Sequence, residues 1–102
     1  MKIVRVHYTT RPEFAQRNME NIAGIVNELK LLNHPGIQYS AYLLPDGKTF
    51  MHFDHFENEE AHQVLTELAS FKKFSAELWA SQLEAEPKLE LPKLVASTLA
   101  LF

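Results

Sequence analysis

The sequence predicts an α+β domain whose elements follow the order strand, helix, strand, strand, helix, strand. Two observations carry this prediction. Short runs of β-branched and aromatic residues alternate at 3–9 and across 37–56, whereas apolar residues recur every three or four positions in two longer stretches. In addition, VHYTTRPEFAQ (6–16) weakly echoes FDHFENEEAHQ (53–63), which divides the chain into two similar halves. This order predicts a ferredoxin-like βαββαβ fold, with an antiparallel four-stranded sheet and two helices on one face.

The composition fits one globular domain over residues 1–102, with 46% hydrophobic and 23% charged residues. The absence of cysteine excludes disulfides, thiolate catalysis and metal sites built on Cys. A net charge of −3, with the ten Lys and Arg scattered along the chain, argues against a nucleic-acid partner. The sequence shows neither a signal-peptide pattern nor an apolar run of about 20 residues, so we expect no membrane partner and a cytoplasmic location.

The first strand is predicted at Ile3–Thr9, with Val4, Val6 and Tyr8 on one face and Arg5 and His7 on the other. The next segment, TRPE (10–13), matches a capping box for a helix that continues to about residue 32. The predicted apolar stripe of this helix is Ala15, Met19, Ile22, Ile25, Val26, Leu29 and Leu32. Gly24 lies within the helix, which suggests close packing against another backbone.

The stretch 37–56 is predicted to form a hairpin. Pro45 and Asp46 suit the centre of a type I turn, and Gly47 suits a left-handed bulge position. In this register one face carries Ser40, Tyr42, Phe50, His52 and Asp54, and the other carries Ile37, Tyr39, Ala41, Met51, Phe53 and His55. A two-residue turn at positions 46–47 would flip the second strand, but proline favours the bulged register because it cannot donate to a strand ladder.

The second half begins with Asn58 as the predicted cap of a helix that runs to about Leu83, with a bend near Ser70. Its apolar stripe includes Ala61, Val64, Leu65, Leu68, Phe74 and Leu78. Residues 88–102 are predicted to form a final strand, bent at Pro92 and covered on both faces. Two helices cover only one face of the sheet, so the aromatic side chains on the other face predict a homodimer, sheet against sheet.

Three segments give the chain a family resemblance: the TxxPE motif (9–13), DGKTFMHF (46–53) and ASFKKF (69–74). With the element order, they resemble the dimeric α/β-barrel superfamily, and within it small proteins related to the antibiotic-biosynthesis-monooxygenase (ABM) domain. The resemblance covers nearly the whole chain and implies a homodimer whose two sheets form an α/β barrel, with a cavity beside or within it. The superfamily includes cofactor-free oxygenases, haem-degrading enzymes and isomerases.

The haem-degrading branch of that superfamily uses an Asn on the first strand, a Trp and a helix His. This chain has Arg5 and His7 on the first strand, Trp79 late in the second helix and His62 early in it. The set does not transfer cleanly, so we expect no cofactor, and haem stays open as an alternative that is not favoured. No metal site is expected either, because neighbouring histidines on the hairpin, at positions 52 and 55, point to opposite faces of a strand.

The predicted catalytic residues are His52, as a general base, and Arg5, which would stabilise negative charge or instead pair with Asp54. The predicted substrate-binding residues are His7, Ser40, Tyr42, Phe50 and Trp79. Two functions remain open. The first is a cofactor-independent monooxygenase or related enzyme acting on a small planar apolar substrate. The second is a non-catalytic dimeric module that binds a ligand or serves as a scaffold, in which Arg5, His7 and His52 are interface residues.

Overall fold

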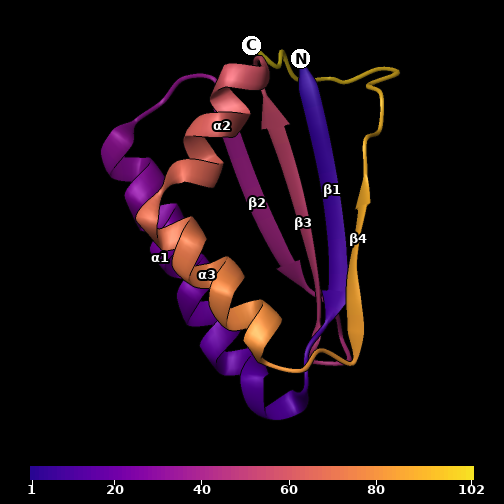
Figure 1. Ribbon diagram of the computed structural model, residues 1–102. Coiled ribbons are helices and arrows are strands. Elements are labelled where there is room, and N and C mark those ends of the chain that lie inside the picture. Colours follow the sequence, from indigo (N-terminus) through magenta and orange to yellow (C-terminus); the bar gives the residue numbers. More distant parts are fainter.

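The computed structural model describes residues 1–102 and has the predicted order of elements (Figure 1). The elements are β1 (Lys2–Thr9), a short 3-10 helix η1 (Pro12–Phe14), α1 (Ala15–Leu32), β2 (Ile37–Leu43), β3 (Thr49–Phe56), α2 (Glu59–Glu67), α3 (Ala69–Ala80) and β4 (Ala85–Glu90). The four strands form one antiparallel sheet in the order β2-β3-β1-β4, and the helices pack on one of its faces. The predicted ferredoxin-like α+β fold is therefore confirmed.

The entry into α1 differs from the predicted capping box. Thr10 is fully buried, and its hydroxyl bonds the backbone oxygen of Lys48 (3.3 Å) rather than a helix amide. Glu13 pairs with Arg11 (2.5 Å) instead of reaching back to residue 10. The prediction was wrong because the 3-10 turn places these side chains elsewhere. The other end was predicted correctly: α1 ends at residue 32, and Asn33 follows in the left-handed region, with φ of 52°.

Gly24 lies inside α1 without the close neighbour that the sequence suggested. No heavy atom lies within 4 Å of the position that a Cβ would occupy there. The packing interpretation was therefore wrong, and the local cost of glycine in a helix has no packing compensation at this position.

The second helical segment is divided into two helices at Leu68, whose backbone is extended (ψ 139°). The predicted cap is confirmed, since the side chain of Asn58 accepts a hydrogen bond from the amide of Ala61 at 2.9 Å. The amide and hydroxyl of Ser70 both donate to Glu28 Oε1 (3.1 and 2.6 Å), which ties the start of α3 to α1. The break thus lies two residues before the predicted bend, and α3 ends at residue 80 rather than near residue 83.

The hairpin turn has the predicted type but one more residue than expected. Gly47 has φ of 76°, and its amide donates to Leu44 O (3.0 Å), as in a type I turn followed by a left-handed residue. However, Asp46 Oδ1 accepts the amides of both Lys48 (3.0 Å) and Thr49 (2.8 Å), so residue 48 belongs to the loop. The first hairpin pair is consequently Leu44 with Thr49, joined by a 2.8 Å bond from the amide of residue 44.

This extra loop residue shifts the register by one, so the predicted pairing was wrong. His52 pairs with Ala41, and Tyr42 pairs with Met51, so the second strand is flipped as in the alternative register that the sequence did not favour. A shift of one residue moves a whole set of side chains to the other face. The helix-covered face carries Val4, Val6, Tyr8, Tyr39, Ala41, Phe50, His52 and Asp54, and the open face carries Arg5, His7, Ser40, Tyr42, Met51, Phe53 and His55.

The last strand is shorter and earlier than predicted. β4 pairs with β1 at the edge of the sheet, where Arg5 faces Glu90. Residues 91–102 form no strand, and Val95 is 97% exposed, so the predicted alternation in this segment was wrong. In Figure 1 this segment leaves β4 and crosses one end of the sheet towards α2. Pro87 lies within β4, which an edge strand tolerates.

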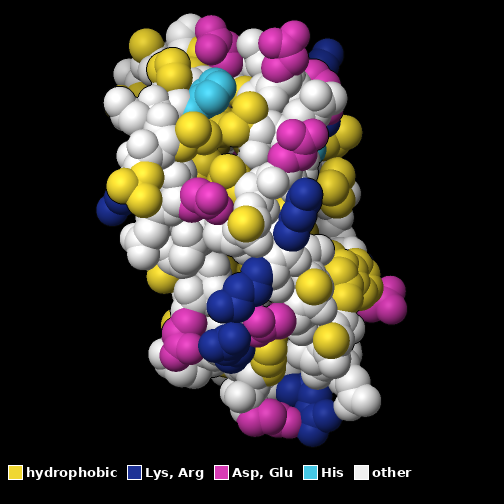
Figure 2. Space-filling model, turned by 60° about the vertical axis from the view of Figure 1, so that its left-hand side comes forward, with side chains coloured by type: hydrophobic (Ala, Val, Ile, Leu, Met, Phe, Trp, Pro, Cys, Tyr) yellow, Lys and Arg dark blue, Asp and Glu magenta, His cyan; other side chains and the backbone are white.

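The helix-bearing side is turned forward in Figure 2, where Lys and Arg lie among Asp and Glu. One ion pair links two helices: Arg17 of α1 donates from Nε to Glu77 Oε1 of α3 at 2.8 Å. Asn21 donates to the same oxygen at 3.0 Å. None of the helices has both the length and the apolar character needed to cross a membrane.

Candidate functional site

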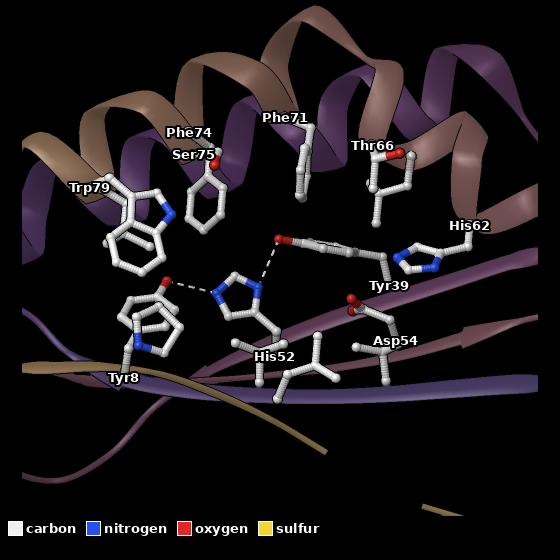
Figure 3. Close-up of a pocket in the computed structure, with 16 residues that line it drawn as sticks. Tyr8, Tyr39, His52, Asp54, His62, Thr66, Phe71, Phe74, Ser75 and Trp79 are labelled. Atoms are coloured by element: carbon white, nitrogen blue, oxygen red, sulfur yellow. Dashed lines mark hydrogen bonds between the residues drawn. The ribbon is translucent and has the colours of Figure 1, made fainter. Parts of the chain in front are cut away.

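A cavity of about 310 Å³ lies between the helix-covered face of the sheet and helices α2 and α3 (Figure 3). Its wall is mostly apolar. The lining residues are Val4, Val6, Tyr8, Tyr39, His52, Asp54, His62, Leu65, Thr66, Phe71, Phe74, Ser75, Leu78, Trp79, Pro87 and Leu89. This volume is at the lower end of the range for small-molecule sites, so it suits a ligand of about two fused rings.

A chain of hydrogen bonds crosses the sheet side of this cavity. His52 is 5% exposed, and each of its ring nitrogens has a tyrosine partner. The Tyr8 hydroxyl lies 2.7 Å from Nε2, and the Tyr39 hydroxyl lies 3.0 Å from Nδ1. Asn18 Nδ2, on α1, donates to the Tyr8 oxygen at 2.8 Å. Figure 3 shows the imidazole held between the two tyrosines, below α3. We call these four side chains the Asn18–Tyr39 relay.

Burial keeps the titratable members of the relay neutral near pH 7. It lowers the pKa of His52 to about 4, because the imidazolium loses its hydration. Burial likewise raises the pKa of both tyrosines above the ordinary value, although the bond from Asn18 partly offsets this for Tyr8. The negative charge of Asp54 further raises the pKa of Tyr39. All four members are thus held together as uncharged hydrogen-bonding groups.

The donor at the start of the relay fixes one bond and is compatible with a resting arrangement in which the last proton is free. An amide nitrogen can only donate, so the Tyr8 oxygen accepts from Asn18 and its own proton is free to bond His52 Nε2. His52 then carries its proton on Nδ1 and donates it to the Tyr39 oxygen. In this arrangement every internal bond is made, and the Tyr39 hydroxyl proton remains available to a molecule in the cavity.

Asp54 is the second polar feature of the cavity wall. It lies two residues after His52 on β3, on the same face, and is the direct cross-strand partner of Tyr39. Its side chain is only 6% exposed, and Oδ1 has no hydrogen-bond partner. Burial raises the pKa of this carboxyl to about 7, although a hydrogen bond that it accepts from the backbone amide of Ser40 opposes the shift. Asp54 therefore changes charge near neutral pH.

Aromatic rings from α3 form the opposite wall. The Phe74 ring centroid lies 5.4 Å from that of His52 and 6.5 Å from that of Tyr8. Phe71 packs on Phe74 at 5.9 Å, and Trp79 borders the cavity while remaining 58% exposed. These flat walls favour a flat apolar ligand.

The structure separates the predicted site residues into two groups. His52 and Trp79 both line the cavity, whereas Phe50 lies on the same face but stacks under Tyr8 in the core (5.7 Å between centroids). Four of the predicted residues, Arg5, His7, Ser40 and Tyr42, lie on the open face and do not reach His52.

The predicted alternative for Arg5, a pair with Asp54, is not formed either. Its guanidinium pairs with Glu90 of β4, and Nε lies 3.3 Å from Met51 Sδ. His7 Nε2 lies 3.9 Å from the same glutamate. These contacts hold the edge strand and leave the arginine outside the cavity.

Several site members were missed, although the sequence contained a signal for some. Tyr8 shares the face of Val4 and Val6, so its hydroxyl had to find a partner inside the core. Asn18 is fully buried on the inner side of α1, next to the predicted apolar stripe. A polar side chain in that position is a signal of an internal network. Tyr39 was missed solely because of the register.

A metal site is not apparent, because no three His, Asp or Glu side chains converge. The chemistry that the residues can perform is hydrogen bonding and proton transfer.

The comparisons with known proteins concern the fold. No protein-family model matches the sequence, and no curated protein matches it. An antibiotic biosynthesis monooxygenase structure has a TM-score of 0.78 at 14% identity, covering 94% of this chain and 100% of its own. A protein of Bacteroides thetaiotaomicron, provisionally given the same name, has a TM-score of 0.83 at 13% identity, covering 99% and 95%. PA3566 from Pseudomonas aeruginosa has a TM-score of 0.76 at 18% identity, covering 93% and 94%.

The chain has the ABM fold. The family resemblance of the sequence is thus confirmed at the level of the fold, along nearly the whole chain.

Proposed function

We propose that this ABM-like protein binds a small, planar, mostly apolar molecule in the cavity and promotes its oxygenation by dioxygen, without a cofactor. The observation that carries the proposal is the Asn18–Tyr39 relay, which presents one tyrosine hydroxyl to an apolar cavity of about 310 Å³. The monooxygenase names of proteins with this fold support the reaction class.

The relay can serve a substrate oxygen in two ways. In the resting arrangement, the Tyr39 hydroxyl donates to a carbonyl or oxyanion. In the reverse arrangement, His52 carries its proton on Nε2 and donates it to Tyr8, whose oxygen has a second lone pair for this bond. Tyr39 then takes a proton from a substrate hydroxyl as it passes its own to His52 Nδ1. In this proposal His52 remains the base, as predicted, but it acts through Tyr39.

The burial of His52 restricts which substrates suit this route. Its pKa falls from 6.5 to about 4, so forming the imidazolium costs about 3 kcal/mol more than in water. A substrate with an ordinary alcohol group would add a further large free-energy cost to the proton transfer. The suitable substrate is an electron-rich hydroxyarene or enol, whose hydroxyl is already acidic because it is conjugated.

The proposed oxygenation balances without a further reductant. A hydroxyarene anion forms one C–O bond with dioxygen, the O–O bond breaks, and the product is a quinone. For 1-naphthol the products are 1,4-naphthoquinone and water, so four electrons pass from the substrate to dioxygen. One oxygen atom enters the substrate, and the other leaves as water with two substrate hydrogens.

The test is dioxygen uptake and quinone formation with 1-naphthol and with 1-naphthols that carry a conjugated carbonyl group. Tyr39→Phe removes the cavity hydroxyl and is expected to lower the rate by about 100-fold or more. Tyr42→Phe is the matched control, because Tyr42 lies 53% exposed on the open face; its rate should not change. Turnover that is insensitive to Tyr39→Phe would refute the relay as the reactive group.

The second candidate function is a non-catalytic ligand-binding module. It is favoured by one observation: both nitrogens of His52 already bond tyrosine hydroxyls, so the relay is complete without a reaction. Binding of naphthols without dioxygen uptake would support this candidate and refute the oxygenase.

We further propose that the protein is a homodimer through the open face of the sheet. The helices cover only the other face (Figure 1). On the open face Tyr42 is exposed, and Met51 and Phe53 are only partly buried. Burying aromatic and apolar side chains of this kind against a second copy removes them from water.

A further inference from the structure

The cavity wall carries few charged groups, and they are of one sign. Among its lining residues Asp54 is the only carboxylic acid, and neither Lys nor Arg is present. Of the two histidines, burial lowers the pKa of His52 to about 4 and also lowers that of His62. At neutral pH and above, the only formal charge that a bound molecule can meet is therefore negative.

One carboxyl oxygen of Asp54 also lacks a hydrogen-bond partner, although it is buried. Oδ1 is shielded from solvent and accepts no hydrogen bond, which costs free energy. The nearest polar side chain on the facing strand is Tyr39, whose hydroxyl bonds His52 instead. In Figure 3 the carboxyl lies beside the base of the Tyr39 ring, on the cavity side of the sheet. A donor group on a molecule in the cavity would satisfy this oxygen if it reached the carboxyl.

The aromatic rings around the cavity favour the same kinds of ligand as the carboxyl. Aromatic faces carry partial negative charge, so they attract ammonium and N–H groups and repel anions. The rings of Phe71, Phe74 and Trp79 face the cavity from α3. His62 also lines the cavity, but burial lowers its pKa below the ordinary 6.5, so it brings no positive charge at pH 8.

We propose that Asp54 selects the ligand on entry: the cavity admits aromatic amines and uncharged hydroxyarenes, which donate a hydrogen bond to the carboxyl, and rejects aromatic carboxylates and phosphates, which enter as anions. This inference rests on the proposed function in one respect, that the cavity is a binding site. It adds the substrate class and assigns it to a residue outside the relay. A cation or neutral donor pairs with the buried carboxyl, whereas a second anion would stand unpaired beside it.

The test uses three probes that share one ring system: 1-aminonaphthalene, 1-naphthol and 1-naphthoate. Affinity is measured by isothermal titration calorimetry at pH 8, where Asp54 is ionised. We expect the amine and the naphthol to bind at least 10-fold more tightly than the carboxylate. Asp54→Asn preserves the shape and removes the charge, so the carboxylate should gain affinity, the amine should lose it, and the ratio should fall towards one.

Glu60→Gln is the matched control, since it removes one carboxylate from an exposed position that does not line the cavity. It should retain the wild-type ratio. Asp54→Leu provides a second cavity variant, with an apolar side chain of similar size, should the amide variant fold poorly. Circular dichroism confirms the fold of each.

The outcomes separate this inference from the proposed function. Equal binding of the three probes by the wild type, or an unchanged ratio in Asp54→Asn, would overturn the selective role of Asp54 and leave the oxygenase proposal standing. The expected discrimination without dioxygen uptake would retain the selection and refute the oxygenase. If none of the probes binds, both proposals fall.

Discussion

Replacing Asp54 by Asn should change how the stability of the protein depends on pH. Burial raises the pKa of this carboxyl from 3.8 to about 7 in the folded state. Between these two values the folded chain holds a proton that the unfolded chain has released. Stability therefore falls as pH rises from about 4 to about 7, because ionisation is easier in the unfolded chain. The amide side chain of the variant cannot ionise, so the variant loses this slope.

The size of the effect follows from the two pKa values. The difference between 3.8 and about 7, at about 1.4 kcal/mol per pH unit, amounts to about 4 kcal/mol. Local relaxation and water entry reduce such a penalty, so we treat this figure as an upper bound. Relative to the wild type, Asp54→Asn should thus gain stability on going from pH 4 to pH 8, by an amount between about 1 and about 4 kcal/mol.

His52 hides this slope in the wild type, because its shift has the opposite consequence. Its pKa falls from 6.5 to about 4 on folding, so the unfolded chain binds the extra proton in that interval and stability rises with pH. The contribution, about 3 kcal/mol, nearly cancels that of Asp54 between pH 4 and 6.5. The dependence of wild-type stability on pH therefore does not reveal either contribution. In Asp54→Asn the contribution of His52 remains alone, so stability should rise with pH.

The assay is urea unfolding at pH 4, 5, 6, 7 and 8, followed by circular dichroism, for the wild type, Asp54→Asn and the exposed control Glu60→Gln. The quantity compared is the variant's free energy of unfolding minus that of the wild type at each pH. A rise confined to Asp54→Asn is expected. A difference that stays flat across this range would refute the reasoning, since it would mean that the carboxyl ionises as freely in the folded protein as in the unfolded chain.

Three other predictions concern the fold and the assembly. Gly24→Ala should raise the free energy of unfolding by up to about 1 kcal/mol, since a methyl group there meets no atom within 4 Å. A lower urea midpoint would show that the position has no room for the methyl group. Asn58→Ala removes the bond to the Ala61 amide and should cost about 1 kcal/mol, and an unchanged urea midpoint would contradict the role of this cap. Light scattering after gel filtration should give the mass of two chains for the wild type. Phe53→Lys on the open face should give the mass of one chain, whereas Leu31→Lys, at an 88% exposed helix position, should still give the mass of two. A monomeric wild type would refute the dimer.

The parts of the fold that were predicted correctly depend on local signals. The end of α1, the cap at Asn58 and the left-handed Gly47 each follow from the preferences of one or two residues. The entry into α1 and the last strand were predicted less well. Thr10 bonds the hairpin loop, and β4 is positioned by pairing with β1; both contacts join residues far apart in the sequence.

The site was predicted only in part because a single side chain sets the hairpin register. Asp46 accepts the amides of Lys48 and Thr49, which lengthens the loop by one residue. Turn preferences predicted the correct turn type, but they do not account for the hydrogen bonds that the Asp46 side chain accepts after the turn. As a result, His52 was predicted to share a face with Tyr42, whereas it shares one with Tyr39. Arg5 was predicted to lie on the same face as His52, whereas it lies on the opposite face of the sheet.

Two atoms in the protein argue that this interior is shaped by something besides stability. The buried side-chain atoms without a hydrogen-bond partner are Asn18 Oδ1 and Asp54 Oδ1. One belongs to the residue that starts the relay, and the other lies in the cavity wall. A core selected for stability alone would favour apolar residues at both positions, because an unpaired buried oxygen costs about 1–3 kcal/mol. Their presence at the start of the relay and in the cavity wall is accounted for if Asn18 holds the Tyr8 hydroxyl in place and Asp54 accepts a donor from the ligand.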